Sequence, residues 1–357
     1  MKFLLILFFP VFVFSQISFE KINEKTKKLA IKYLDKEEIP AMSISISYND
    51  TIIFSEGFGY ADLENKTTVI PSKTKFEIAS ITKMITASVL GKMSEDGIIN
   101  LNNSPYFYLD SLSKKQYNFT IKQLAGHIAG LKRDVSEENW EIKNTYSKKD
   151  FYSVFKKDSM LCKPTTKFSY SNYGFKVLGF VIEKIKNKKI FEVQKEYIYT
   201  PLKMGNTRIN NGIYDENTVS FYKHSEGKLK KFTDYICNNS CYAEGCNLST
   251  SEDLIKLGNS FLFVNRLLKP ETLKELIISQ KLIDGTKTNY GIGVISGKDI
   301  LGNYYFGHGG NSISARSELK IYPNSKLVIV MLANKSKNEE DDLVEKIASN
   351  YIEFLKN

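Results

Sequence analysis

Strand patterns lie near both ends of the chain, and a longer, mostly helical region separates them. Near the N-terminus, Ala41–Ser47 alternates apolar and small polar residues, and Thr51–Gly57 follows a turn as the second strand of a hairpin. Further strand patterns occur near the C-terminus, at Tyr290–Ser296, Tyr304–Gly307, Ser314–Tyr322 and Leu327–Ala333. Strands at both ends predict an α+β fold in which one sheet is built from both chain ends and the helical part is inserted as a second lobe.

The chain of 357 residues is 42% hydrophobic, which is enough for one large domain or two closely packed lobes. After a leader at 1–16, we expect a single domain over 17–357. Its sheet lobe would span about 17–78 and 288–357, and its helical lobe about 79–287. Apolar periodicity predicts helices at Ile17–Lys36, after Ser80, at Ile121–Gly130, Val177–Ile185, Leu248–Phe263, Thr272–Leu282 and Glu339–Leu355.

Residues 1–16 differ from the rest of the chain. Lys2 gives a positive start, an apolar run follows over Phe3–Phe14, and the small residue Ser15 offers a cleavage position. The run is shorter than the roughly 20 residues that a membrane-spanning helix needs. The segment therefore predicts a signal peptide and a mature protein that is periplasmic or secreted, with no stable membrane insertion after cleavage.

The chain is basic, but its charges are mixed. Fifty Lys and Arg residues against forty Asp and Glu residues give a net charge of +10. A basic balance can indicate nucleic-acid or membrane partners, yet no long basic block occurs, and we expect no nucleic-acid partner. A polyanion-binding role is an alternative, and its binding would collapse with added salt.

Four cysteines occur, with Cys162 apart from a cluster of Cys237, Cys241 and Cys246. An even count in an exported chain predicts disulfides, with three possible connectivities. A zinc site is the alternative, although the cluster lacks a Cys-x-x-Cys pair and the nearest histidine, His224, lies in a predicted charged loop. Nothing in the sequence indicates a metal or another cofactor.

Ser80 and Lys83 lie three residues apart at the start of a helical pattern. Positions i and i+3 share a helix face, so the hydroxyl and the amine can meet. A serine becomes nucleophilic when a base takes its proton, and a lysine buried beside an apolar helix can lose its own proton and help. The spacing recurs at seven other places, where a solvated polar pair explains it, but only Ser80 precedes an uninterrupted apolar helix.

Tyr170 and Asn172 lie in a predicted loop before the helix at Val177–Ile185. A tyrosine phenol can relay protons if a nearby lysine ammonium stabilises its phenolate. The amide of Asn172 offers both a donor and an acceptor, which suits a substrate amide. A turn with a packing tyrosine would give the same pattern.

His308, Gly309 and Gly310 lie between two predicted strands. Glycines there let a substrate approach a strand edge closely, and backbone N–H groups at such an edge can stabilise an oxyanion. The alternative is a glycine turn beside an exposed histidine.

The three motifs Ser80-x-x-Lys83, Tyr170-x-Asn172 and His308-x-Gly310, in this order, resemble those of the serine β-lactamase-like hydrolases. This family includes class C β-lactamases, D-aminopeptidases, DD-carboxypeptidases, esterases and mitochondrial LACTB-type peptidases. Three other segments resemble family blocks, at residues 124–131, 200–207 and 243–262. The resemblance covers roughly residues 25–350 and implies a β-lactamase/transpeptidase-like fold, with an antiparallel sheet flanked by helices.

The resemblance also implies catalytic roles. Ser80 would be the nucleophile, Lys83 its partner, and Tyr170 a general base whose phenolate Lys83 stabilises. The backbone N–H groups of Ser80 and Asn311 would form the oxyanion hole. Which of Lys83 and Tyr170 takes the first proton stays open, because coupled groups titrate as a pair.

Substrate binding would fall to Asn172, His308 and Gly310, together with Asn311. His308 stands where β-lactamases carry the lysine of Lys-Thr-Gly. Gly309 stands where the His-x-Gly branches usually carry Thr or Ser. Both differences weaken the binding of a β-lactam carboxylate.

The sequence thus predicts an exported serine hydrolase that acts through an acyl-serine intermediate. Its substrate would be a peptide, of D-amino-acid or cell-wall type, or an ester. The alternatives are a non-catalytic or slow penicillin-binding or sensor protein of the same fold, and a weak β-lactamase. The sequence gives no oligomeric state.

Overall fold

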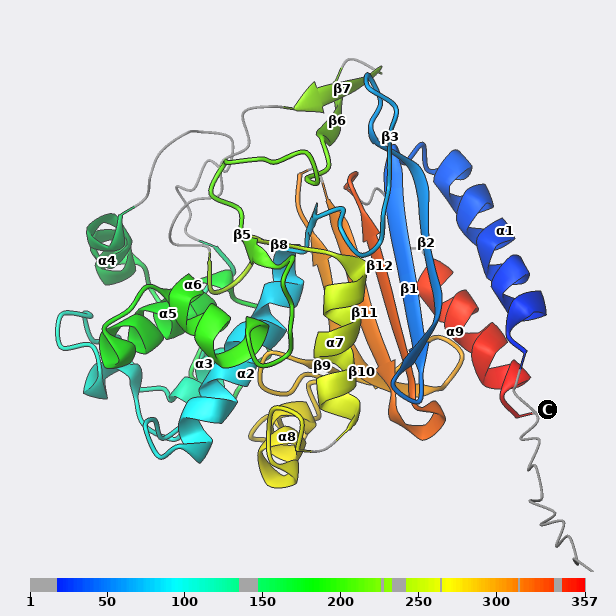
Figure 1. Ribbon diagram of the computed structural model, residues 1–357. Coiled ribbons are helices and arrows are strands. Elements are labelled where there is room, and N and C mark those ends of the chain that lie inside the picture. The colour runs from blue at the N-terminus through cyan, green and yellow to red at the C-terminus, as the bar shows by residue number, and fades with distance from the viewer. Residues whose placement is uncertain are drawn as a thin grey trace, which may run out of the picture.

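The computed structural model describes residues 18–134, 147–225, 228–232, 242–263, 265–313, 315–336 and 342–356. A seven-stranded sheet crosses the molecule in the order β3-β2-β1-β12-β11-β10-β9 (Figure 1). Its strands are β1 (Ala41–Tyr48), β2 (Thr51–Asp62), β3 (Thr67–Thr68), β9 (Ile295–Lys298), β10 (Tyr304–Asn311), β11 (Arg316–Tyr322) and β12 (Leu327–Ala333). Neighbouring strands are antiparallel, and the β1–β12 pair joins the two ends of the chain as predicted.

Helices cover both faces of this sheet (Figure 1). Helices α1 (Glu20–Lys36) and α9 (Leu343–Phe354) lie side by side on one face, and α7 (Ser251–Leu262) packs on the other face against β1 and β12. Burial from both sides explains why every residue of β12, which reads LVIVMLA, is apolar and buried.

The middle of the chain forms the helical part beside the sheet (Figure 1). Its helices are α2 (Thr82–Glu95), α3 (Ile121–Ala125), α4 (Lys148–Lys157), α5 (Asn172–Lys186), α6 (Ile190–Gln194) and α8 (Pro270–Ile277). Helix α2 is buried on nearly all sides, and four polar residues are buried together with its apolar ones: Thr82, Lys83, Thr86 and Ser88.

Short strands in the same region were not predicted. One small sheet consists of β4 (Phe76–Glu77), β8 (Asn247–Ser249) and β5 (Arg208–Ile209), and one hairpin consists of β6 (Phe221–Ser225) and β7 (Lys228–Phe232). Strands of two or three residues are too short to give a periodic pattern.

The predicted end of β2 at Gly57 is wrong, since the strand continues to Asp62. A Cβ atom on Gly57 would lie 2.2 Å from the carbonyl oxygen of Val69, and one on Gly59 would lie 2.2 Å from that of Pro40. These glycines therefore mark close backbone contacts within the strand rather than its end.

The strand predicted at Tyr290–Ser296 is also wrong over most of its length, because β9 begins at Ile295. Gly293 has a left-handed φ of +66° and packs where a Cβ would lie 2.6 Å from Ala87, so the chain turns there. His308–Gly310 lies within β10 and not between strands.

Several helix ends differ from the prediction. Helix α5 begins at Asn172, so the Tyr170 loop is shorter than expected. Helix α7 begins at Ser251 rather than at Leu248, and Thr250 caps it by accepting a hydrogen bond from the Asp253 N–H. Helices α3, α8 and α9 are shorter than predicted.

The prediction that the four cysteines form disulfides is wrong for Cys162, which has a free thiol. Cys246 is disulfide-bonded. His224 lies in strand β6 and not in a loop. Cys237, Cys241 and the predicted signal peptide lie outside the described residues. None of the helices that the structure describes is long and apolar enough to cross a membrane.

Candidate active site

Ser80 lies in a 3₁₀ turn, Ala79–Ile81, that joins β4 to α2. It therefore precedes the predicted helix instead of beginning it. Ala79 has a left-handed φ of +41°, which is strained for a residue with a Cβ. Two hydrogen bonds of Ile78 hold the start of the turn: its N–H donates to the Asn247 carbonyl oxygen at 2.9 Å, and its carbonyl oxygen accepts from the Ser317 hydroxyl at 2.7 Å.

Lys83, in the first turn of α2, lies directly behind Ser80. Its Nζ atom donates hydrogen bonds to the Ser80 Oγ at 3.1 Å and to the Glu244 carbonyl oxygen at 3.0 Å. The side chain is fully buried, and Nζ lies 5.0 Å from the centre of the Tyr170 ring and 5.5 Å from that of Phe175. The predicted hydroxyl–amine pair is therefore formed in a water-poor environment.

Tyr170 is positioned by the start of α5 and by His127. The Ser171 N–H donates to His127 Nδ1 at 3.0 Å, and the Tyr170 and His127 rings lie 4.2 Å apart between centres. The Asn172 Nδ2 donates to Asp134 Oδ1 at 2.7 Å. The buried Asn172 Oδ1 accepts no hydrogen bond from a described residue, so it is a possible acceptor for a substrate N–H.

His308 is buried, which excludes the exposed histidine of a glycine turn. Its Nε2 lies 2.8 Å from the Tyr290 hydroxyl and its Nδ1 lies 2.5 Å from the Gly309 carbonyl oxygen. A carbonyl only accepts, so the network assigns the proton to Nδ1 and leaves Nε2 as the acceptor. Burial, together with the charge of Lys83, lowers the pKa of His308 to about 3.

His127 is a site residue whose role the sequence did not reveal. Burial, followed by the charge of Lys83, lowers the pKa of His127 well below its usual range. Burial raises the pKa of Tyr290 well above its usual range, so this phenol stays protonated and donates to His308. Two neutral imidazoles thus flank Lys83 without adding positive charge.

This arrangement predicts a loss of stability in mild acid. In the folded protein His308 stays neutral down to about pH 3, whereas the unfolded chain protonates it near pH 6.5. Stability therefore falls as the pH drops from 6.5 towards 3, by about 2 kcal/mol between pH 7 and pH 5 for this group. Urea unfolding of wild type and His308→Asn measures the difference; equal pH dependence of the two proteins would contradict the prediction.

Gly310 brings the Ser80 turn against β10. A Cβ atom there would lie 2.5 Å from the Ile78 carbonyl oxygen and 2.9 Å from the Ala79 Cβ. The glycines predicted a close approach by substrate, but the close neighbour of Gly310 is the turn that carries the nucleophile. Strand β9 pairs with β10 only over Tyr304–Gly307. The residues of β10 that follow Gly307, on the side of Ser80, therefore have no partner in β9.

Ser80 lies where two cavities meet. The larger, of about 980 Å³, is lined among others by Tyr170, His308, Gly310 and Asn311. The smaller, of about 230 Å³, is lined among others by Asn172, Glu244 and Asn311. The structure thus brings all the predicted site residues together, with Lys83 beneath the nucleophile.

A buried ion pair that no sequence pattern indicated lies beside the site. Lys176 Nζ on α5 lies 3.7 Å from Glu244 Oε1, and both side chains are almost completely buried. The same Glu244 offers its backbone carbonyl oxygen to Lys83. Its neighbour Ala243 accepts a hydrogen bond from the Thr86 hydroxyl at 2.7 Å, so this segment is fixed to both α2 and α5.

The family model described as Beta-lactamase matches residues 26–350 of this chain. The chain belongs to the Beta-lactamase family. Protein flp of Staphylococcus aureus strain MW2 is 25% identical to it over 326 residues, which cover 87% of this chain and 63% of that protein. The human mitochondrial serine beta-lactamase-like protein LACTB is 22% identical over 398 residues, which cover 85% of this chain and 73% of that protein.

Among solved structures, D-amino acid amidase from Ochrobactrum anthropi SV3, complexed with L-phenylalanine, superposes on this Beta-lactamase family member with a TM-score of 0.80. The sequence identity is 19%, and the match covers 94% of this chain and 99% of that one. The predicted family and fold class are therefore confirmed. The chain belongs to a serine hydrolase family, with an amidase among its structural neighbours.

Proposed function

We propose that this Beta-lactamase family member is a serine hydrolase that works through an acyl-serine intermediate. The observation that carries the proposal is the 3.1 Å hydrogen bond between the buried Lys83 amine and the Ser80 hydroxyl, at the junction of two cavities. A surface Ser-x-x-Lys pair has neither the burial nor the adjoining space that acyl transfer needs.

The reaction would proceed in two steps, acylation of Ser80 and hydrolysis of the acyl-serine. Ser80 Oγ attacks the substrate carbonyl and gives its proton to the Lys83/Tyr170 pair, while the backbone N–H groups of Ser80 and Asn311 stabilise the oxyanion. The pair then protonates the leaving amine or alcohol, and an acyl-serine remains. Water attacks this ester and loses a proton to the same pair. The pair passes that proton to Ser80 Oγ as the acyl C–O bond breaks, which releases the acid and restores Ser80.

Peptide and ester substrates fit the site better than a β-lactam. The ring of His308 is neutral, and Gly309 has no hydroxyl, so strand β10 presents neither a lysine charge nor a threonine oxygen to a β-lactam carboxylate. The amide acceptor at Asn172 Oδ1 suits a peptide N–H. The similarity to a D-amino acid amidase supports a D-amino-acid peptide as the first class to test.

We also propose that the protein is exported to the periplasm or the medium, because residues 1–16 have the composition of a signal peptide. The intact mass of the protein recovered from a bacterial host shows whether residues 1–16 have been removed. A chain lacking about the first 16 residues supports export, and a chain that keeps Met1–Gln16 contradicts it.

The test of function is the intact mass of wild-type protein incubated separately with an ester probe, a D-Ala-D-Ala peptide and a penicillin. We expect a transient acyl adduct and turnover with the ester or the peptide, and little turnover of the penicillin. An adduct that forms but never decays would favour the slow penicillin-binding or sensor alternative. No adduct with any of the three reagents would overturn the proposal.

A further inference from the structure

His127 ends helix α3 in a backbone conformation that favours glycine. Its φ of +58° is left-handed. Its N–H donates to the Leu124 carbonyl oxygen at 3.2 Å, and the Ile128 N–H donates to the Gln123 carbonyl oxygen at 3.0 Å. These two hydrogen bonds form a Schellman motif, in which glycine is the usual left-handed residue. A histidine at this position therefore strains the backbone where glycine would not.

The imidazole of His127 is buried, and only one of its nitrogens is paired. The residue is 1% exposed. Its Nδ1 accepts the hydrogen bond from the Ser171 N–H, so the proton of the neutral ring lies on Nε2. Nε2 has no hydrogen-bond partner among the residues that the structure describes. A buried polar atom without a partner is unfavourable, so an apolar side chain would serve packing alone better than this histidine.

His127 holds the segment that carries Tyr170 at three points. The His127 carbonyl oxygen accepts from the Ser169 N–H at 2.8 Å, and its Nδ1 accepts from the Ser171 N–H at 3.0 Å. Between these two bonds, the Tyr170 ring packs on the imidazole, with 4.2 Å between the ring centres and a tilt of 39°. The same tyrosine ring lies 5.0 Å from Lys83 Nζ. A single residue thus fixes both the backbone and the ring of the proposed base.

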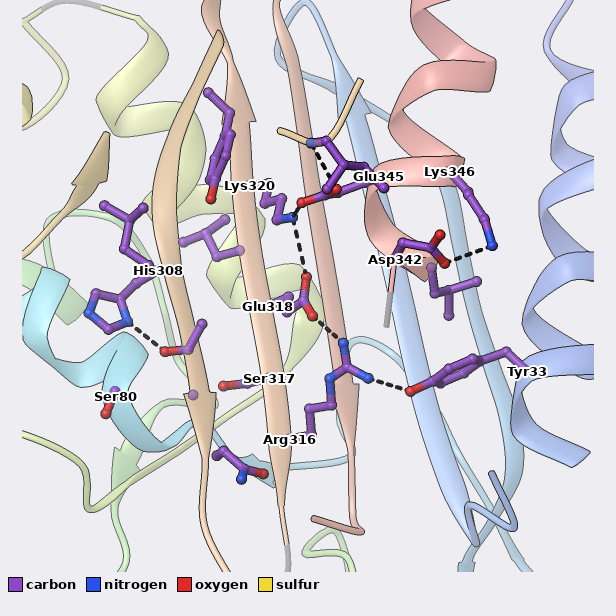
Figure 2. Close-up of a pocket in the computed structure, with 18 of the residues that line it drawn as sticks. Tyr33, Ser80, His308, Arg316, Ser317, Glu318, Lys320, Asp342, Glu345 and Lys346 are labelled. Carbon is purple, nitrogen blue, oxygen red and sulfur yellow. Dashed lines mark hydrogen bonds and ion pairs between the residues drawn. The ribbon is translucent and has the colours of Figure 1, made fainter. Parts of the chain in front are cut away.

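The other neighbours of the Tyr170 ring restrain it less. His308 and Ser80 line the cavity that Tyr170 also lines, and both lie on the same side of β10 (Figure 2). The rings of His308 and Tyr290 are each centred 6.2 Å from that of Tyr170. Of the ring contacts that Tyr170 makes in the described part of the chain, the one with His127 is therefore the closest.

We propose that His127 is a positioning residue for proton transfer, which holds the Tyr170 phenol where the Lys83/Tyr170 pair exchanges protons with Ser80. The inference rests on the proposed hydrolase function and adds a residue outside the three sequence motifs. The strained turn and the unpaired Nε2 are explained if the ring and the Nδ1 acceptor are needed beside Tyr170. A misplacement of about 1 Å can cost about 100-fold in rate, so losing these contacts should slow the chemical step.

Three variants separate the backbone, the acceptor and the ring. His127→Gly suits the left-handed turn and removes the side chain. His127→Asn also suits that turn and returns an oxygen acceptor for the Ser171 N–H. His127→Phe keeps a ring beside Tyr170 without an acceptor. With a chromogenic ester, we expect kcat of His127→Gly to fall about 10- to 100-fold with little change in KM, and His127→Asn to recover part of the loss.

The pH profile distinguishes positioning from packing. The acid limb of kcat/KM reports the group of the free enzyme that must lose its proton. If Tyr170 moves away from Lys83, the ammonium stabilises the phenolate less, so the limb of His127→Gly should move to higher pH and its deficit should shrink in alkali. The control is Ile347→Ala, which opens a cavity in the separate core under α9 and should leave the limb unchanged.

The outcomes keep the two proposals apart. If the wild-type protein neither hydrolyses the ester nor reacts with a fluorophosphonate, the hydrolase proposal fails. If the wild type is active but His127→Gly matches its kcat, or is slower by the same factor at every pH, His127 only fills the core and the positioning proposal is overturned. Equal acid limbs in His127→Gly and His127→Asn would also overturn it, whether or not His127→Phe folds.

Discussion

The Ser80→Ala variant is expected to form no acyl adduct and to lose hydrolysis by about 10³-fold or more, which is typical when a nucleophile is removed. The reason is chemical, because alanine has no oxygen to attack the carbonyl. The fold should survive, since Ser80 is only partly buried and the bonds of Ile78 hold its turn independently of the hydroxyl. Fluorophosphonate labelling and intact mass measure the effect.

The matched control is Ser153→Ala. Ser153 and Lys156 have the same spacing on α4, but both are exposed and neither lines a cavity of the active site. This variant should label like wild type. Labelling of Ser80→Ala at the wild-type rate would place the nucleophile elsewhere, and loss of labelling in Ser153→Ala would contradict the assignment of the nucleophile to Ser80.

The overall fold was predictable because its signals are long and periodic. The sheet built from both chain ends and helix α1 were anticipated from alternation and from apolar spacing. The predicted end of β2 was wrong, because the sequence does not reveal which parts of the chain pack against its glycines. The strand was predicted to end at Gly57, yet Gly57 and Gly59 mark points where the backbones of Val69 and Pro40 pass close to β2.

The catalytic residues were predictable, because each belongs to a short sequence motif. The contacts that surround them in the folded chain were not predictable. Ser80, Lys83 and Tyr170 each lie in a recognisable local pattern. The contact of Lys83 with the Glu244 backbone joins residues 161 positions apart, and any residue type could supply that carbonyl. The lowered pKa of His308 likewise depends on burial and on the nearby charge of Lys83, which only the folded chain brings together.

The buried pair of Lys176 and Glu244 leads to the second large effect. Lys176→Met should lower the free energy of unfolding by about 3–5 kcal/mol, because it leaves the Glu244 carboxylate in the interior without its lysine partner. The carbonyl oxygen that holds Lys83 belongs to the same residue, so labelling of Ser80 should slow as well. Urea unfolding and the fluorophosphonate labelling rate report the two effects separately.

Two further proteins make this prediction specific. The double variant Lys176→Met/Glu244→Met removes both charges and should recover most of the lost stability, because apolar side chains can replace a buried ion pair. Lys122→Met breaks a pair with Glu275 whose side chains are 30% and 39% exposed, and should cost about 1 kcal/mol or less. If Lys176→Met is no less stable than Lys122→Met, or the double variant is no more stable than the single one, the ion pair does not hold the Glu244 segment against Lys83.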